Sequence, residues 1–121
     1  MRFKVFVYGS LKRDFPLHHH LTGARYLGEA KLPGFRMYDL GWYPGIVPGE
    51  GTIFGELYEV DFTTLLLLDQ IEDEGEEYRR ELLEVFTQEG EKVPAFVYVY
   101  RGRVEDKREI VGGRWEKKGP F

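Results

Sequence analysis

Two short stretches of the sequence carry groups that could do chemistry, and the first is the loop at residues 8–11. Apolar residues spaced by two, such as Val5 and Val7, predict a half-buried strand that stops at Gly9. A glycine there allows a positive φ or a close approach to a ligand, and successive N–H groups can converge on an anion. The loop could therefore bind a carboxylate. The alternative is an ordinary strand-ending turn, which is the commoner role of a lone glycine.

The second stretch ends a leucine-rich segment. Leu65, Leu68 and Glu72 fall at i, i+3 and i+7, so a helix would place them on one stripe. Desolvation and the negative helix end would both raise the pKa of a carboxylate at that place, which makes Glu72 a candidate general base. The alternative is that the helix ends by Ile71 and that Glu72 opens a solvated acidic loop at residues 72–77. Periodicity alone favours this alternative.

Other chemistries find little support in the sequence. There is no cysteine, and neither phosphate-binding glycine motifs nor a Gly-x-Ser-x-Gly elbow are present. The adjacent His18, His19 and His20 lack the spacing of a zinc site, so we expect no metal and no other cofactor. Ser10 is a weaker candidate nucleophile, because no histidine base is assured beside it.

Composition indicates one folded domain over residues 1–121. The chain is 42% hydrophobic and 16% aromatic, and no apolar run reaches the length of a bilayer span. Because Met1 leads directly into a strand, we expect a cytoplasmic protein without membrane contact. The net charge of −4 argues against nucleic acid as a partner, and we expect a monomer. A 31% share of charged residues without any asparagine is typical of proteins from thermophiles.

The expected elements are mostly strands joined by short turns. A helix over residues 62–72 is capped by Asp61, and a shorter one begins near His18. Pro33-Gly34 predicts a turn, and the glycine- and proline-rich residues 41–51 predict a loop. The expected strands are residues 2–8, 26–31, 35–39, 52–60, 78–87 and 93–101. This pattern predicts an α+β or mostly β protein with a small curled sheet.

Two details of the last third bear on packing. Residues 93–101 are apolar on both faces, which predicts a central strand of a barrel or one covered by a helix. From Gly102 onward the chain is charged, and residues 112–115 are its only anchor-like feature, with Trp115 as the large apolar residue. We therefore expect the end of the chain to be loosely held.

Five stretches of the chain share a further feature: residues 5–13 with Pro16 and His18, Tyr43-Pro44, residues 55–60, residues 68–72 with Tyr78 and Arg80, and residues 110–115. Together they resemble the γ-glutamylcyclotransferase-like family, in particular γ-glutamylamine cyclotransferase and AIG2-like proteins. The sequence departs from the family pattern at Asp14 and Leu17, which affects the rim of the expected pocket and hence the substrate.

The resemblance implies a small six-stranded type of mixed β-barrel with flanking helices and a cavity at one mouth. It implies that Glu72 is the acid/base that cyclises a γ-glutamyl amide to 5-oxoproline and frees an amine, with a small γ-glutamyl molecule as the partner. Two other activities stay open: a non-catalytic module that binds small acidic metabolites, and a lyase-like or acyltransferase reaction using Glu72. The residues expected to bind or border the substrate are Tyr8, Gly9, Ser10, Leu11 and Tyr78, with Arg80 as a further candidate.

Overall fold

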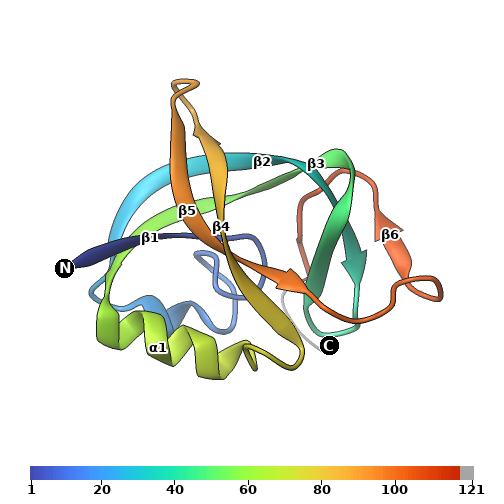
Figure 1. Cartoon of the computed structure of the whole chain (residues 1–121), viewed down its shortest axis with the longest axis horizontal. Coiled ribbons are helices and arrows are strands. Elements are labelled where there is room, and N and C mark those ends of the chain that lie inside the picture. The colour runs from blue at the N-terminus through green and yellow to red at the C-terminus, as the bar shows by residue number, and fades with distance from the viewer. Residues whose placement is uncertain (118–121) are drawn as a thin grey trace.

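The computed structural model describes residues 1–117. Six strands, one α-helix and one short 3₁₀ helix are found in this part of the chain (Figure 1). The predicted hairpin at residues 78–101 and the short helix at His18 are confirmed. In chain order the elements are β1 (Arg2–Val7), η1 (His18–Leu21), β2 (Arg25–Asp39), β3 (Pro44–Asp61), α1 (Phe62–Ile71), β4 (Tyr78–Thr87), β5 (Lys92–Tyr100) and β6 (Arg108–Ile110).

Five of the strands close into a barrel. Their order is β3-β1-β5-β4-β2, and pairing between β2 and β3 closes the ring. β1 runs parallel to β5 while the other pairs are antiparallel, so the barrel is mixed. The predicted small mixed barrel is confirmed, but its expected six-stranded type is wrong, because five strands close the ring. The sixth strand, β6, is not part of the ring, because it pairs only with the end of β2 at Met37 to Asp39.

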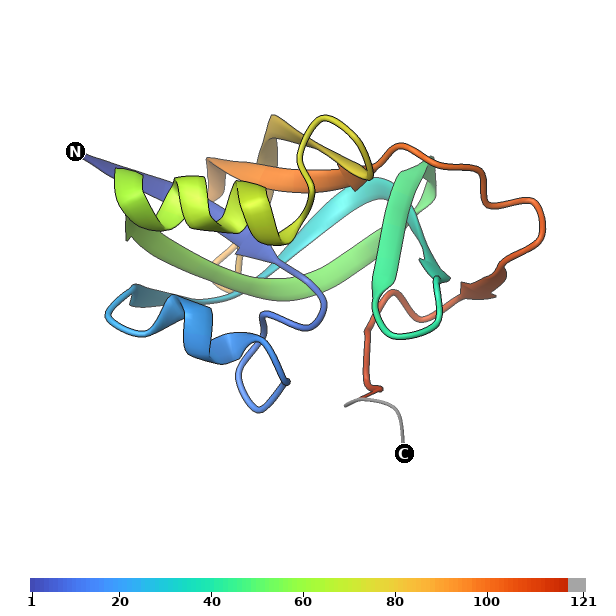
Figure 2. The same cartoon turned by 90° about the horizontal axis from the view of Figure 1, so that it is seen from below.

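Alternating residues of β1 and β5 divide the core into two clusters. Phe6 and Val97 face the barrel interior, while Val5 and Tyr98 face outward into a second cluster that includes Leu68. Figure 2 shows α1 lying along the outside of the barrel, where it covers this second cluster. The prediction that both faces of residues 93–101 are covered is therefore confirmed.

The helix α1 begins where the sequence predicts it. Asp61 has an extended backbone and accepts a hydrogen bond from the Thr64 N–H at 2.8 Å, as an N-cap does. Leu65 and Leu68 are buried against the barrel wall. The helix ends at Ile71, so Glu72 is its C-cap.

The expected loop at residues 41–51 is wrong, because β3 begins at Pro44 and continues to Asp61. β1 pairs with β3 only from Glu56 onward, so among the described strands the earlier part of β3 pairs with β2 alone. Such an edge tolerates prolines, which have no N–H to donate. At Gly51 a Cβ would lie 2.7 Å from the Phe35 carbonyl oxygen, so this glycine permits close strand packing and not a turn.

One other expectation also needs correction. Pro33-Gly34 is not a turn: β2 runs through it with a register shift, and Gly34 has a φ of +90° at this bulge. The anchor-like feature at residues 112–115 is confirmed, because Trp115 is only 1% exposed and packs in the barrel interior. Residues 118–121, the last part of the end expected to be loosely held, lie outside the described residues.

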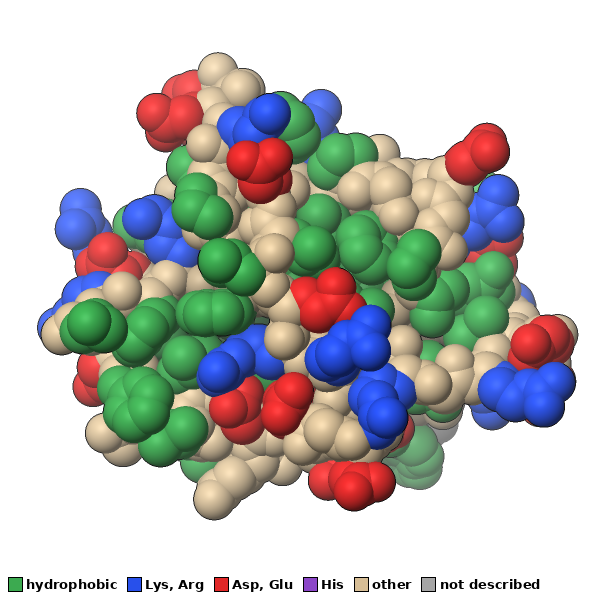
Figure 3. Space-filling view, viewed as in Figure 1, with side chains coloured by type: hydrophobic (Ala, Val, Ile, Leu, Met, Phe, Trp, Pro, Cys, Tyr) green, Lys and Arg blue, Asp and Glu red, His purple; other side chains and the backbone are tan. Residues whose placement is uncertain are grey.

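The surface mixes charges of both signs. Figure 3 shows acidic and basic side chains close together on one face, with apolar patches between them. Within residues 1–117, no helix is long and apolar enough to cross a membrane. The cytoplasmic location therefore stays a prediction.

The two tryptophans offer a matched test of the interior cluster. Trp115→Ala is expected to lower the free energy of unfolding by about 3–5 kcal/mol, because it empties the barrel interior. Trp42→Ala removes the same side chain from a position that is 60% exposed, and should change little. Urea denaturation of both variants measures the difference, and equal losses would contradict the assignment of Trp115 to the core.

Candidate active site

A cavity of about 190 Å³ opens at one mouth of the barrel. Its walls come from the loop after β1, the C-terminal end of α1, the start of β3 and the strands β4 and β5. All six residues that the sequence assigned to catalysis or binding line this cavity: Tyr8, Gly9, Ser10, Leu11, Glu72 and Tyr78. The structure thus brings together two stretches that lie about sixty residues apart in the sequence.

The loop at residues 9–11 presents backbone N–H groups without acceptors. Within the described residues, we find no hydrogen bond donated by the amides of Gly9, Ser10 or Leu11. Their carbonyl oxygens, in contrast, are occupied. Lys12 N–H donates to the Gly9 carbonyl at 3.1 Å, and Leu17 N–H donates to the Ser10 carbonyl at 2.9 Å. Successive backbone donors without acceptors are an arrangement that can bind an anion, so anion binding at this loop stays a prediction.

Gly9 serves this loop by its small size. Its φ lies outside the left-handed region, so a positive φ is not the reason for the glycine. A Cβ on Gly9 would lie 2.8 Å from the Cγ and Cδ atoms of Pro44, which is too close. The loop can therefore lie against the start of β3 only because position 9 has no side chain.

More contacts fix the loop from the outside. Arg13 N–H donates to Glu56 Oε1 at 2.9 Å, and the Lys12 ammonium donates to the Trp115 carbonyl at 2.8 Å. The Nδ1 atom of His18 lies 3.0 Å from the Leu11 carbonyl oxygen. The three histidines do not converge, and no group of three possible metal ligands is found in residues 1–117.

Glu72 lies in the cavity and is half buried. Its N–H donates to the Leu68 carbonyl at 2.9 Å, which fixes the last turn of the helix below it. Burial raises the pKa of the Glu72 carboxyl to about 7, and the charge of Glu77 adds to the rise. The alternative of a fully solvated loop is thus wrong for Glu72, although it describes Asp73 through Glu76, which are exposed.

Tyrosines make up much of the rest of the wall. The Tyr8 hydroxyl donates to the Tyr98 carbonyl at 2.6 Å, and the Tyr78 hydroxyl donates to the Pro44 carbonyl at 2.6 Å. Burial raises the pKa of both hydroxyls, and the Glu72 charge raises them further. Both tyrosines therefore stay neutral at physiological pH and brace the backbone around the cavity.

Sequence reasoning missed part of the lining. Glu77 was placed in the solvated loop, yet it lines the cavity and accepts a hydrogen bond from the Tyr43 hydroxyl at 2.7 Å. Tyr98 was expected only as a strand residue, and nothing in its alternating pattern distinguishes a cavity wall from a core position. Arg80, a candidate border residue, is not among the residues that line the cavity.

Comparison with known proteins identifies a family that covers most of the chain. The family described as "Gamma-glutamyl cyclotransferase, AIG2-like" matches residues 5–117, which include every residue of the cavity. The chain belongs to this family. Members of the γ-glutamyl cyclotransferase, AIG2-like family with similar sequences occur in bacteria.

Three relatives illustrate the match. A protein of Citrobacter rodentium, named as a gamma-glutamylcyclotransferase family protein, is 42% identical over 93% of this chain and 94% of its own length. YtfP of Escherichia coli carries the same family name, and its solution structure is 40% identical with a TM-score of 0.73, covering 93% of this chain and 96% of that one. The crystal structure of a mouse AIG2-like protein has a TM-score of 0.87 at 30% identity, covering 98% and 91% of the two chains.

The free amides of the loop lead to a binding prediction. Gly9→Ala is expected to weaken the binding of a small carboxylate such as glutamate by about tenfold or more, because the new methyl group pushes the loop away from Pro44. NMR titration measures this through the amide signals of residues 9–11. Gly112→Ala is the control, since a Cβ there meets open space. Binding that leaves these amide signals unchanged in the wild type would show that the anion lies elsewhere.

Burial of Glu72 leads to a second prediction, on stability. The pKa of Glu72 is near 4.5 in an unfolded chain and about 7 in the folded protein, so the folded state holds the proton more tightly. Raising the pH from about 4.5 to above 7 should therefore lower the free energy of unfolding of the wild type by up to about 3 kcal/mol. The Glu72→Gln side chain never carries a charge, so this variant should be more stable than the wild type at about pH 8.5. At about pH 4 the difference in stability between the two proteins should be much smaller.

Urea denaturation at both pH values measures this effect. Glu76→Gln is the matched control, because Glu76 is exposed and its substitution should change stability equally at both. A Glu72→Gln stability difference that does not vary with pH would contradict a raised pKa.

Proposed function

We propose that this chain cyclises γ-glutamyl amides to 5-oxoproline and releases the amine. The observation that carries the proposal is the shared cavity of residues 9–11 and Glu72, in which three free amide donors lie with a carboxyl group whose pKa is raised to about 7. Such a carboxyl can accept and return a proton near neutral pH. Membership in the family supports the same reaction.

The proposed reaction is intramolecular. The α-amino nitrogen of the substrate attacks its own γ-carbonyl carbon, a five-membered ring closes, and the bond from that carbon to the leaving nitrogen breaks. Glu72 first takes one proton from the α-ammonium group, which frees the attacking electron pair, and then returns this proton to the leaving nitrogen. The ring nitrogen loses a second proton after the attack, and the released amine takes it up and leaves as an ammonium ion. The enzyme gains most by holding the folded conformer, since attack within one molecule has a high effective concentration.

The loop is proposed to hold the glutamyl group. The amides of Gly9, Ser10 and Leu11 donate to the substrate carboxylate and to the oxyanion that develops on the γ-carbonyl. The Ser10 hydroxyl adds a further donor, and the rings of Tyr8 and Tyr78 form walls that limit the conformers the substrate can adopt. The reaction exchanges one amide for another without a change of redox state, so the proposal invokes no metal or other cofactor.

The alternatives fit the site less well. Covalent catalysis by Ser10 needs a base beside the hydroxyl, and among the described residues no hydrogen bond joins Ser10 to a histidine. A pure binding module has no need for a buried carboxylate, which costs stability and is typical of acid–base sites. The remaining alternative is a lyase-like or acyltransferase reaction. These two enzyme classes differ in how the cleavage of the amide bond is classified, and both would use Glu72 as the acid/base.

Glu72→Gln is the direct test of the proposed base. It keeps the shape and volume of the side chain, so the protein should fold and still bind a γ-glutamyl ligand through the loop amides. Its turnover should fall by roughly 10²–10⁴-fold, the usual share of general acid–base catalysis. Formation of 5-oxoproline from a panel of γ-glutamyl amides measures turnover, and the same panel identifies the amine that the enzyme prefers.

Glu76→Gln provides the control, because the Glu76 side chain is exposed and lies outside the cavity lining. The wild-type rate should fall as the pH drops below about 7, where Glu72 becomes protonated. A Glu72→Gln protein that forms 5-oxoproline at the wild-type rate would rule out the proposed role of Glu72. Absence of turnover in the wild type with every amide would instead favour the binding module.

A further inference from the structure

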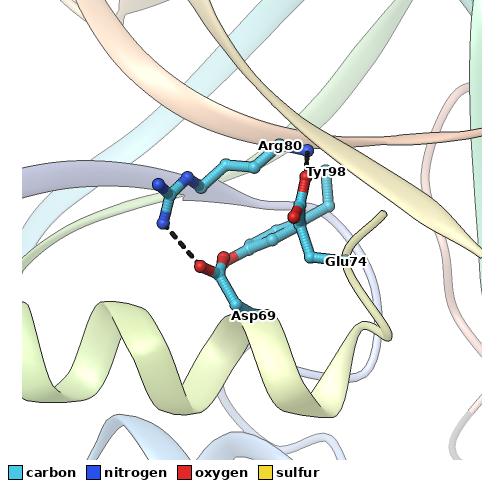
Figure 4. Close-up of polar contacts among 4 residues, drawn as sticks. All are labelled: Asp69, Glu74, Arg80 and Tyr98. Atoms are coloured by element: carbon cyan, nitrogen blue, oxygen red, sulfur yellow. Dashed lines mark hydrogen bonds and ion pairs between the residues drawn. The ribbon is translucent and has the colours of Figure 1, made fainter. Parts of the chain in front are cut away.

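One polar cluster near the cavity has no part in the mechanism above. Asp69 lies in the last turn of α1, and each of its carboxylate oxygens has a partner on a different strand (Figure 4). Oδ1 accepts the Tyr98 hydroxyl of β5 at 2.7 Å, and Oδ2 accepts Arg80 Nη1 of β4 at 2.8 Å. The side chains of Asp69 and Arg80 are only 21% and 25% exposed, so this is no ordinary surface ion pair.

Arg80 also holds the chain on the other side of Glu72. Its backbone N–H donates to Glu74 Oε2 at 3.2 Å, as Figure 4 shows, and its guanidinium lies 4.8 Å from the centre of the Phe96 ring. Asp69 precedes Glu72 by three residues and Glu74 follows it by two. Arg80 therefore binds the chain on both sides of the proposed base, at Asp69 and at Glu74.

The charges in this cluster complement the end of the helix. The last turn of α1 contains no basic residue of its own, so its negative end has no cation within the helix. Arg80 supplies that cation from β4 and neutralises Asp69 at the same time. Asp69 and Glu72 are neighbours on the helix surface, since residues three apart lie on the same side. Without Arg80, the Asp69 carboxylate would lie unbalanced one helical turn before Glu72.

We propose that Asp69 is a positioning residue, which fixes the end of α1 to β4 and β5 through Arg80 and Tyr98 and so holds the Glu72 carboxyl at the proposed reacting atoms. Tyr98 carries this restraint into the cavity, because its ring is part of the wall while its hydroxyl binds Asp69. The expected loss of turnover when Asp69 is replaced rests on the proposed function, whereas the expected change at the Glu72 carboxyl does not.

Several other titratable groups lie around Glu72, and their effects on its pKa must be distinguished from those of the Asp69–Arg80 pair. They are Tyr8 just after β1, Tyr43 before β3, Tyr78 of β4, Tyr98 of β5 and Glu77 of the connecting loop. Burial is the main cause that raises the pKa of Tyr8, Tyr78 and Tyr98. For Tyr43 the main cause is the hydrogen bond to Glu77. All four tyrosines therefore stay neutral near pH 7. Glu77 is thus the charged neighbour within the lining, whereas Asp69 and Arg80 form a charge pair outside it.

Removing one member of the pair at a time gives opposite electrostatic effects. Asp69→Asn leaves the Arg80 cation unbalanced, which favours the charged form of Glu72 and should lower its pKa. Arg80→Gln leaves the Asp69 anion unbalanced and should raise it. Loosening of the fold alone would expose Glu72 to water and lower its pKa in both variants, so the opposite signs separate the two explanations.

The pKa of Glu72 can be measured without substrate, by NMR titration of protein labelled with ¹³C at the glutamate carboxyl groups. Glu77→Gln is a positive control that should lower the pKa of Glu72, because it removes the neighbouring charge. Glu84→Gln is the matched negative control. Glu84 is an exposed acid of β4 whose carboxylate lies 3.7 Å from Lys92, so its loss should leave Glu72 unchanged.

Kinetics complete the test. Asp69→Asn and Arg80→Gln should each lower kcat by roughly 10–100-fold, as expected for a misplaced catalytic group, while KM changes less than about twofold because the loop still grips the substrate. Arg80→Lys keeps the charge and should keep the pKa of Glu72 near that of the wild type. If Asp69→Asn does not fold, Arg80→Gln and Tyr98→Phe test the two links of Asp69 separately.

Shifts of the same sign in both variants, or no shift, would overturn the proposal. Opposite shifts without a loss of kcat in an active enzyme would also overturn it, because Asp69 would then tune the charge of Glu72 and not its position. A wild type that turns over no γ-glutamyl amide would refute the proposed function alone. In that case crystal structures of Asp69→Asn and Arg80→Gln would test the position directly, and a Glu72 carboxyl that keeps its wild-type place in both variants would overturn the proposal.

Discussion

Partial burial of one carboxylate is the constraint on which the site depends. Water stabilises a charged carboxylate, so moving Glu72 into the cavity raises its pKa to about 7 and weakens the folded state above that pH. The barrel and the helix must supply enough apolar contact to offset this loss. They do so through two core clusters on opposite faces of the same strands. The placement of Glu72 is therefore a property of the whole fold and not of the acidic loop that follows it.

The alternation of β1 explains why the two halves of the site meet. Val5 and Val7 face the helix, whereas Phe6 and Tyr8 face the barrel interior. The strand therefore ends where the inner and outer clusters meet, at the mouth that the end of α1 also reaches. Because β1 is held between β3 and β5, the loop that follows it has a rigid base. Binding groups on such a base lose little freedom when a ligand arrives.

Much of the fold could be predicted from local patterns. The capped helix, the hairpin at residues 78–101 and the two-faced strand β5 all depend on neighbouring residues, and they were predicted correctly. Residues 41–51 were not, because glycine and proline usually mark loops and only a partner strand reveals an edge that tolerates them. Barrel closure was available only through the family resemblance, since it joins strands far apart in sequence. Glu77 and Tyr98 reached the cavity by tertiary packing that no periodicity records.

The contact between the Lys12 ammonium and the Trp115 carbonyl joins positions 103 residues apart. During synthesis the ribosome makes the binding loop early and adds its outer support about a hundred residues later. The same is true of the interior, where Trp115 packs with Phe6. A chain that has been synthesised only as far as residue 114 lacks both contacts, so its barrel interior is incomplete and the loop has lost one support. Contacts of such long sequence separation are expected to form late in folding.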